Sequence, residues 1–153
     1  MTGLCERHGI PDSAHYVCGF VFNSLLTDVL LIRKARPDWQ AGKLNGMGGL
    51  IQPDEDSRTA MSRECRQECG LGFQPWAWQP VAAIYRPKAF LVHFYFATTP
   101  SIDEAKSLTD EQVVRHKVAD LMHLDTVRHV RWLICLAVDP FVASEIIVEE
   151  RDP

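Results

Sequence analysis

The sequence predicts a single α/β domain in which helices pack on a mixed β-sheet. Several short apolar, β-prone segments are interrupted by one helix in the middle of the chain and followed by another near its end. A short polar turn separates the first two strand-like segments, which is typical of an antiparallel hairpin and favours a mixed over a purely parallel sheet. The 153 residues, 46% of them apolar, suit one domain spanning 1–153 with a core of its own.

The strands are expected where apolar, β-prone residues cluster. Before them, residues 1–14 mix charges, glycine and proline without a period, and we expect a poorly ordered lead-in. The predicted strands cover residues 16–22, 29–32, 47–51, 81–85, 91–98 and 146–149, and the ambiguous stretch 113–124 is expected to include another short one.

The central helix is predicted over residues 57–69. Asp56 or Ser57 can cap its first amides, apolar residues recur at every fourth position, and Gly70 can adopt the left-handed conformation that closes the last turn. The second helix is expected over residues 126–138, after a polar capping residue.

Residues 35–46 are predicted to form a loop. They contain Pro37, Gly42 and Gly46, which interrupt regular structure, and Trp39 is a candidate anchor for the loop. The loop leads directly into the predicted strand 47–51.

Charge and cysteine content exclude some classes of function. The formal net charge of −4 gives no electrostatic reason to expect a nucleic-acid polymer or an anionic membrane as partner. The five cysteines are scattered without a CxxC pair, which favours reduced thiols over a disulfide framework. No apolar run is long enough to span a bilayer, and no signal peptide is evident. We therefore expect a cytoplasmic protein.

The central helix carries the chemistry. Glu64, Gln67 and Glu68 lie three and four positions apart and project from one face. Two carboxylates at this spacing repel each other unless a cation neutralises them, and oxygen ligands favour Mg²⁺, Mn²⁺ or Ca²⁺. Because Mg²⁺ completes its coordination with water and substrate phosphates, the cluster indicates phosphate chemistry. The alternative is a solvated acidic helix face.

The surrounding residues decide between these interpretations. Counting from the first glycine, the motif is Gly, five residues, Glu, seven residues, Arg-Glu, and then Glu and Gly-Leu at fixed offsets. This pattern resembles the Nudix box of the Nudix hydrolases, and it covers about a sixth of the chain. The residues that match are Gly49, Glu55, Arg63, Glu64, Cys65, Glu68, Gly70 and Leu71.

The resemblance implies an α/β/α sandwich, a mixed sheet between helices, and hydrolysis of a compound linked to a nucleoside diphosphate with Mg²⁺ or Mn²⁺. It implies that Glu64 and Glu68 are metal ligands that also assist the attacking water, and that the carbonyl of Gly48 is a further ligand. Gln67 stands where the family has a glutamate. Its amide oxygen can still ligate a hard cation but brings no charge.

The resemblance also implies structural roles in the motif. Arg63 would pair with Glu55 and hold the loop against the helix. Gly49 and Gly70 are the fixed glycines at the two ends of the motif.

The segment 42–49 resembles the one that precedes the box in members that cleave nucleoside triphosphates, including oxidised guanine nucleotides. Asn45 is the candidate contact to the base, and its alternative is an ordinary turn asparagine. Lys43 and Arg33 are candidate phosphate contacts or surface charges. Glu111 is a candidate general base in an acidic loop, or a solvated acid.

We expect a metal-dependent pyrophosphohydrolase that converts a nucleoside triphosphate, including oxidised or non-standard ones, to the monophosphate and pyrophosphate. One alternative substrate is another nucleoside-diphosphate-linked compound, such as a nucleotide sugar or a dinucleotide polyphosphate. Another alternative is a nucleotide-binding domain in which Gln67 impairs catalysis. The partner is a small nucleotide, and a homodimer remains open.

Overall fold

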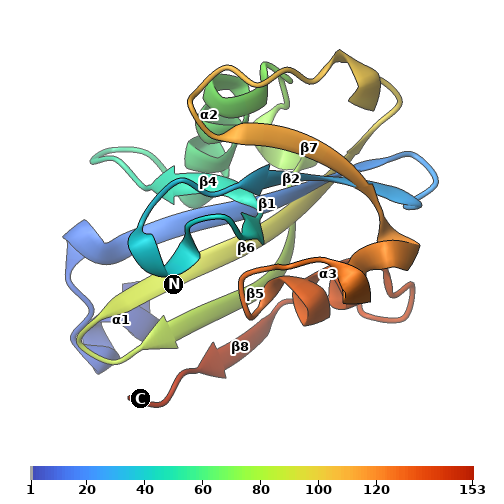
Figure 1. Ribbon diagram of the computed structural model, residues 1–153. Helices are drawn as coiled ribbons and strands as arrows, with labels where there is room; N and C mark the ends of the chain where they lie inside the picture. The colour runs from blue at the N-terminus through green and yellow to red at the C-terminus, as the bar shows by residue number, and fades with distance from the viewer. Residues whose placement is uncertain (1) are drawn as a thin grey trace.

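The computed structural model describes residues 2–153, and it confirms the predicted sandwich on a mixed sheet (Figure 1). Helix α2 covers one face of the sheet and α3 covers the other. The helices are α1 Thr2–His8, α2 Ser57–Cys69 and α3 Val130–Val138. The strands are β1 His15–Asn23, β2 Asp28–Arg33, β3 Leu44–Asn45, β4 Met47–Leu50, β5 Gln79–Arg86, β6 Phe90–Thr99, β7 Gln112–Lys117 and β8 Ile146–Glu149.

Strand β1 organises the sheet. The strand order is β3-β2-β1-β6-β5-β8, with β4 also paired to β1 and β7 to β2. Strand β1 runs parallel to β6 and antiparallel to both β2 and β4, so the predicted hairpin and the mixed character are both confirmed. After β2 the chain reverses, because β3 pairs antiparallel with β2, and β4 then runs along the side of β1 that β2 also occupies.

Alternation along β1 builds two cores, one on each face of the sheet. Phe20 and Phe22 belong to the core that α3 covers, together with Leu133. Val17 and Val21 belong to the core that α2 covers. This is the period of two that a strand buried on both faces requires.

Both ends of α2 are set by local chemistry, as predicted. The side chain of Asp56 accepts a hydrogen bond from the amide of Thr59 at 2.8 Å and caps the helix. Gly70 closes it with φ of 81°, and its amide donates to the carbonyl of Arg66.

The expected start of the second helix at residue 126 is wrong. The amide of Leu44 donates to the carbonyl of Asp125 at 2.9 Å, and the amide of Val127 donates to the carbonyl of Leu44 at 2.8 Å. This bridge to β3 keeps residues 125–127 extended, so α3 begins only at Val130.

The lead-in also differs from the expectation of poor order. Helix α1 forms there, and Leu4 and Ile10 are buried against Ala83, Tyr85 and Leu91 of the sheet. A segment without a clear period is ordered here because it covers an apolar part of β5 and β6.

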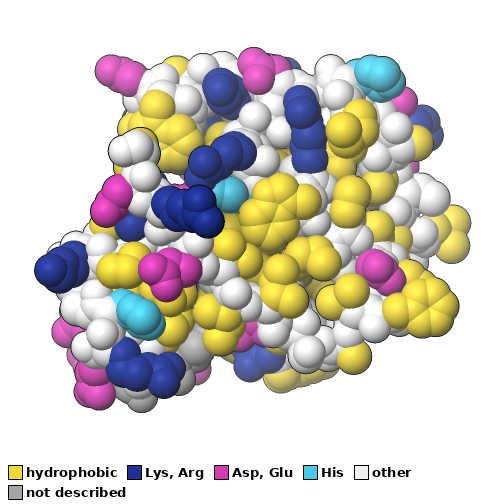
Figure 2. Space-filling model, turned by 90° about the horizontal axis from the view of Figure 1, so that it is seen from below, with side chains coloured by type: hydrophobic (Ala, Val, Ile, Leu, Met, Phe, Trp, Pro, Cys, Tyr) yellow, Lys and Arg dark blue, Asp and Glu magenta, His cyan; other side chains and the backbone are white. Residues whose placement is uncertain are grey.

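The face that carries α3 and β8 displays hydrophobic side chains over its middle (Figure 2). Trp132, Phe141 and Val142, on α3 and after it, are exposed. None of the helices within residues 2–153 is long and apolar enough to cross a bilayer.

Candidate active site

The site forms where α2 packs against β4. The amide of Gly48 donates a hydrogen bond of 3.0 Å to Oε2 of Glu68, which is buried. A Cβ at position 49 would lie 2.6 Å from Oε1 of Glu64, so a larger residue there would displace the carboxylate of Glu64 from its place beside the strand. The strand and the helix therefore bring both carboxylates to the glycine pair.

The two carboxylates affect each other. Burial, followed by the charge of Glu64, raises the pKa of Glu68 from 4.5 to about 8. Ionised together, these groups create a strong negative potential in a partly buried place, and a divalent cation would relieve it.

Arg63 ties the loop before α2 to the helix. Its Nη2 donates to Oε1 of Glu55 at 2.6 Å and to the carbonyl of Leu50 at 3.0 Å, while its Nη1 donates to Oε1 of Glu64 at 2.7 Å. Hydrogen bonds from Arg63 hold the pKa of Glu55 below its usual range. One guanidinium thus fixes the loop and orients the acid of the site.

Glu111 lies buried just before β7, and both of its carboxylate oxygens accept hydrogen bonds. Oε1 accepts from Nζ of Lys34 at 2.9 Å, and Oε2 accepts from the amide of Ala35 at 2.6 Å. Burial raises the pKa of Glu111, but these hydrogen bonds outweigh it and leave the pKa below its usual value. The neighbouring Asp110 pairs with Arg36 at the surface.

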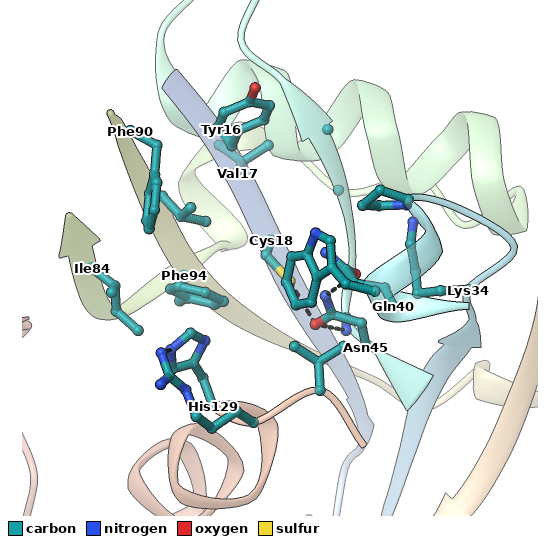
Figure 3. Close-up of a pocket in the computed structure, with 18 of the residues that line it drawn as sticks. Tyr16, Val17, Cys18, Lys34, Gln40, Asn45, Ile84, Phe90, Phe94 and His129 are labelled. Atoms are coloured by element: carbon teal, nitrogen blue, oxygen red, sulfur yellow. Dashed lines mark hydrogen bonds between the residues drawn. The ribbon is translucent and has the colours of Figure 1, made fainter. Parts of the chain in front are cut away.

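A cavity of about 900 Å³ opens beside the glycine pair, on the face of the sheet that carries α3. In Figure 3, Lys34, Gln40 and Asn45 lie on one side of it, and Phe90 and Phe94 lie on the other. This combination of apolar walls with a few polar groups is typical of a small-molecule site.

Only some of the predicted substrate contacts line this cavity. Asn45 does: its Nδ2 donates to Oε1 of Gln40 at 3.1 Å, and its own Oδ1 accepts from the amide of Gly46 at 2.8 Å. Lys43 lines the cavity too. Arg33 is not among the lining residues; it is exposed and donates to the carbonyl of Gly42 at 3.1 Å.

A family model of the NUDIX domain matches residues 14–134, which is most of the chain. The chain belongs to the Nudix family. No curated protein matches it.

Solved Nudix structures share the fold of the chain. A MutT structure described for Aliivibrio salmonicida and Vibrio cholerae is 20% identical, with a TM-score of 0.65 over 82% of this chain and 98% of that one. The Nudix domain of Shewanella oneidensis NrtR, complexed with ADP ribose, is 13% identical, with a TM-score of 0.70 over 90% and 96%. The MutT Nudix hydrolase of Burkholderia pseudomallei is 16% identical, with a TM-score of 0.68 over 82% and 98%.

The Nudix motif of this chain offers hard oxygen donors for a metal ion. Within residues 2–153 no three His, Cys, Asp or Glu side chains already converge as a metal cluster. Glu64, Glu68 and the carbonyl of Gly48 are nevertheless oxygen donors of the kind that divalent cations take, and a bound cation would offset the burial and the charge of Glu64 that raise the pKa of Glu68. Gln67, at the position where the family motif has a glutamate, has an exposed side chain.

Sequence reasoning missed two parts of the site. Lys34 contacts Glu111 across 77 positions of sequence, and no local pattern indicates such a contact. Glu150 follows β8 and lines the cavity next to His129, whose Nε2 lies 2.6 Å from Oε1 of Glu150. Trp132 is exposed and packs edge-on against His129.

Proposed function

We propose that this Nudix protein is a metal-dependent pyrophosphohydrolase that cleaves a nucleoside triphosphate to the monophosphate and pyrophosphate. Membership of the Nudix family supports the coarser statement, a hydrolase of nucleoside-diphosphate-linked compounds. The observation that carries the proposal is the position of Glu64 and Glu68 against the glycine pair, because Gly48 and Gly49, unlike the two acids, line the cavity that Asn45 also lines.

Each group has a role in this chemistry. Glu64, Glu68 and the carbonyl of Gly48 would hold Mg²⁺ or Mn²⁺, with the exposed Gln67 as a further neutral oxygen donor. The bound ion would polarise a phosphoryl oxygen and lower the pKa of water. Arg63 keeps Glu64 in place during the reaction.

The proposed bond changes are those of a hydrolysis. The oxygen of a water molecule attacks a phosphorus, the bridging P–O bond breaks, and pyrophosphate leaves with the electron pair. A carboxylate of the site accepts the proton from water. Glu64 and Glu68 are the candidates, and Glu111 becomes one only if it releases Lys34 or Ala35, since both of its oxygens accept hydrogen bonds.

Three observations support other candidates. A cavity of about 900 Å³ has room for more than one nucleoside, and the NrtR Nudix domain is complexed with ADP ribose, which supports another diphosphate-linked substrate as the second candidate. The neutral Gln67 supports the third, a nucleotide-binding domain with impaired catalysis.

A substrate panel tests the proposal. Triphosphates, their oxidised forms, nucleotide sugars and dinucleotides are incubated with Mg²⁺ and then Mn²⁺, and the products are separated by ion-exchange chromatography. Monophosphate and pyrophosphate from a triphosphate support the proposal. Cleavage only of another compound favours the second candidate, and binding without products from any compound favours the third.

A further inference from the structure

The loop between β2 and β3 borders the cavity, and backbone contacts hold it in place. The amide of Lys34 donates to the carbonyl of Lys43, and the amide of Gly42 donates to the carbonyl of Lys34, both at 2.8 Å. The beginning of the loop is fixed to Glu111 through Lys34 and Ala35. The fold of this loop is therefore explained without a contribution from the side chain of Trp39.

Trp39 lies in this loop at η2, Asp38–Gln40, and its environment is unlike that of a structural tryptophan. Trp39 is 65% exposed, so the prediction that it anchors the loop is wrong, yet it lines the cavity. Trp78 shows what a structural tryptophan looks like in this chain: it is fully buried, and its Nε1 donates to Oγ of Ser62 at 3.0 Å. A large, exposed aromatic surface at the edge of a cavity is available to a ligand.

The chemistry of the cavity indicates which part of a ligand this surface suits. Gln40, next to Trp39 in the chain, lies across the cavity from Phe90 and Phe94 (Figure 3). Trp39, Phe90 and Phe94 all line the cavity, and such aromatic walls favour a flat, π-rich group. Nucleobases stack on aromatic side chains regardless of which hydrogen-bond donors and acceptors they carry.

We propose that Trp39 is a substrate-binding residue whose indole stacks on the nucleobase of the bound substrate and covers the open side of the cavity. The inference rests on the proposed function and adds that the cavity holds the base of the substrate. Glu111 fixes the loop that carries Trp39.

Steady-state kinetics test this role with three variants. Trp39→Ala should raise KM about 5- to 150-fold, the range known for loss of one base-stacking contact, and leave kcat nearly unchanged, because stacking is equal in the ground and transition states. Trp39→Phe should retain most of the affinity. Trp76→Ala is the matched control, since Trp76 is 80% exposed but does not line the cavity, and it should behave as wild type.

Tryptophan fluorescence separates this inference from the proposed function. Guanosine and adenosine monophosphate, added without metal, should quench the wild-type protein and the Trp76→Ala variant but not the Trp39→Phe variant. Quenching in a protein that hydrolyses nothing would overturn the proposed function and support the role of Trp39. Normal KM in Trp39→Ala, in a protein that does hydrolyse its substrate and melts as wild type does, would overturn the role of Trp39.

Discussion

Replacing Glu68 by glutamine should make the metal-free protein more stable in mildly alkaline solution. The carboxyl group of Glu68 has a pKa of 4.5 in its ordinary state and of about 8 in the fold, where burial and Glu64 oppose its charge. Between these values the folded protein keeps a proton that the unfolded chain has released. The free energy of unfolding therefore falls as the pH rises. The contribution of protonated Glu68 to this free energy is fully present below pH 4.5 and is lost above about pH 8.

The magnitude follows from this gap. At about 1.4 kcal/mol per pH unit, the difference between 4.5 and about 8 corresponds to about 5 kcal/mol as an upper bound. Glutamine removes the charge but keeps an oxygen that can accept the hydrogen bond from Gly48. We expect wild type and Glu68→Gln to differ little near pH 5, and the variant to be more stable by up to this amount near pH 8.

Urea unfolding in the presence of a chelator measures the difference at both pH values. Glu104→Gln is the matched control, because Glu104 is an exposed glutamate in the loop before β7. Added Mg²⁺ should remove the disadvantage of the wild type at high pH, since the ion binds the charged pair. A variant that is less stable than wild type near pH 8 without metal would refute the reasoning.

Three further substitutions test residues of the motif around Glu64 and Glu68. Arg63→Ala should lower the free energy of unfolding by about 2–3 kcal/mol because Glu55 loses its partner while half-buried; urea unfolding checks this, with the exposed Arg66→Ala as control. Gly70→Ala should cost about 1 kcal/mol because φ is 81°, and a thermal melt shows whether it does. Gln67→Glu should tighten Mn²⁺ binding measured by calorimetry, since it adds a negative charge to the helix face; unchanged affinity would place position 67 outside the metal site.

Local signals in the sequence predicted the parts of the fold that local chemistry determines. Helix α2 begins and ends where Asp56 and Gly70 indicate, because a capping side chain and a left-handed glycine act within one turn of the helix. The same motif placed Glu64 and Glu68 on one helix face. Its spacing, by itself, gives no indication that burial raises the pKa of Glu68 to about 8.

Contacts between distant segments account for what was missed. The start of α3 is delayed because Val127 pairs with Leu44, and the lead-in is helical because Leu4 finds a partner surface on the sheet. The contact of Lys34 with Glu111 is of the same kind. Each depends on which segments the sheet brings together, and no window of neighbouring residues contains that information.

The most direct test of the central claim is product release from the substrate panel by wild type and by Glu64→Gln, with both proteins shown to melt alike. The account predicts monophosphate and pyrophosphate from a nucleoside triphosphate with the wild type and Mg²⁺ or Mn²⁺, and no turnover with the variant. Near-normal turnover in Glu64→Gln would contradict the role of the acid pair. If the wild type released no product from any compound, the conclusion that the protein is a hydrolase would be contradicted.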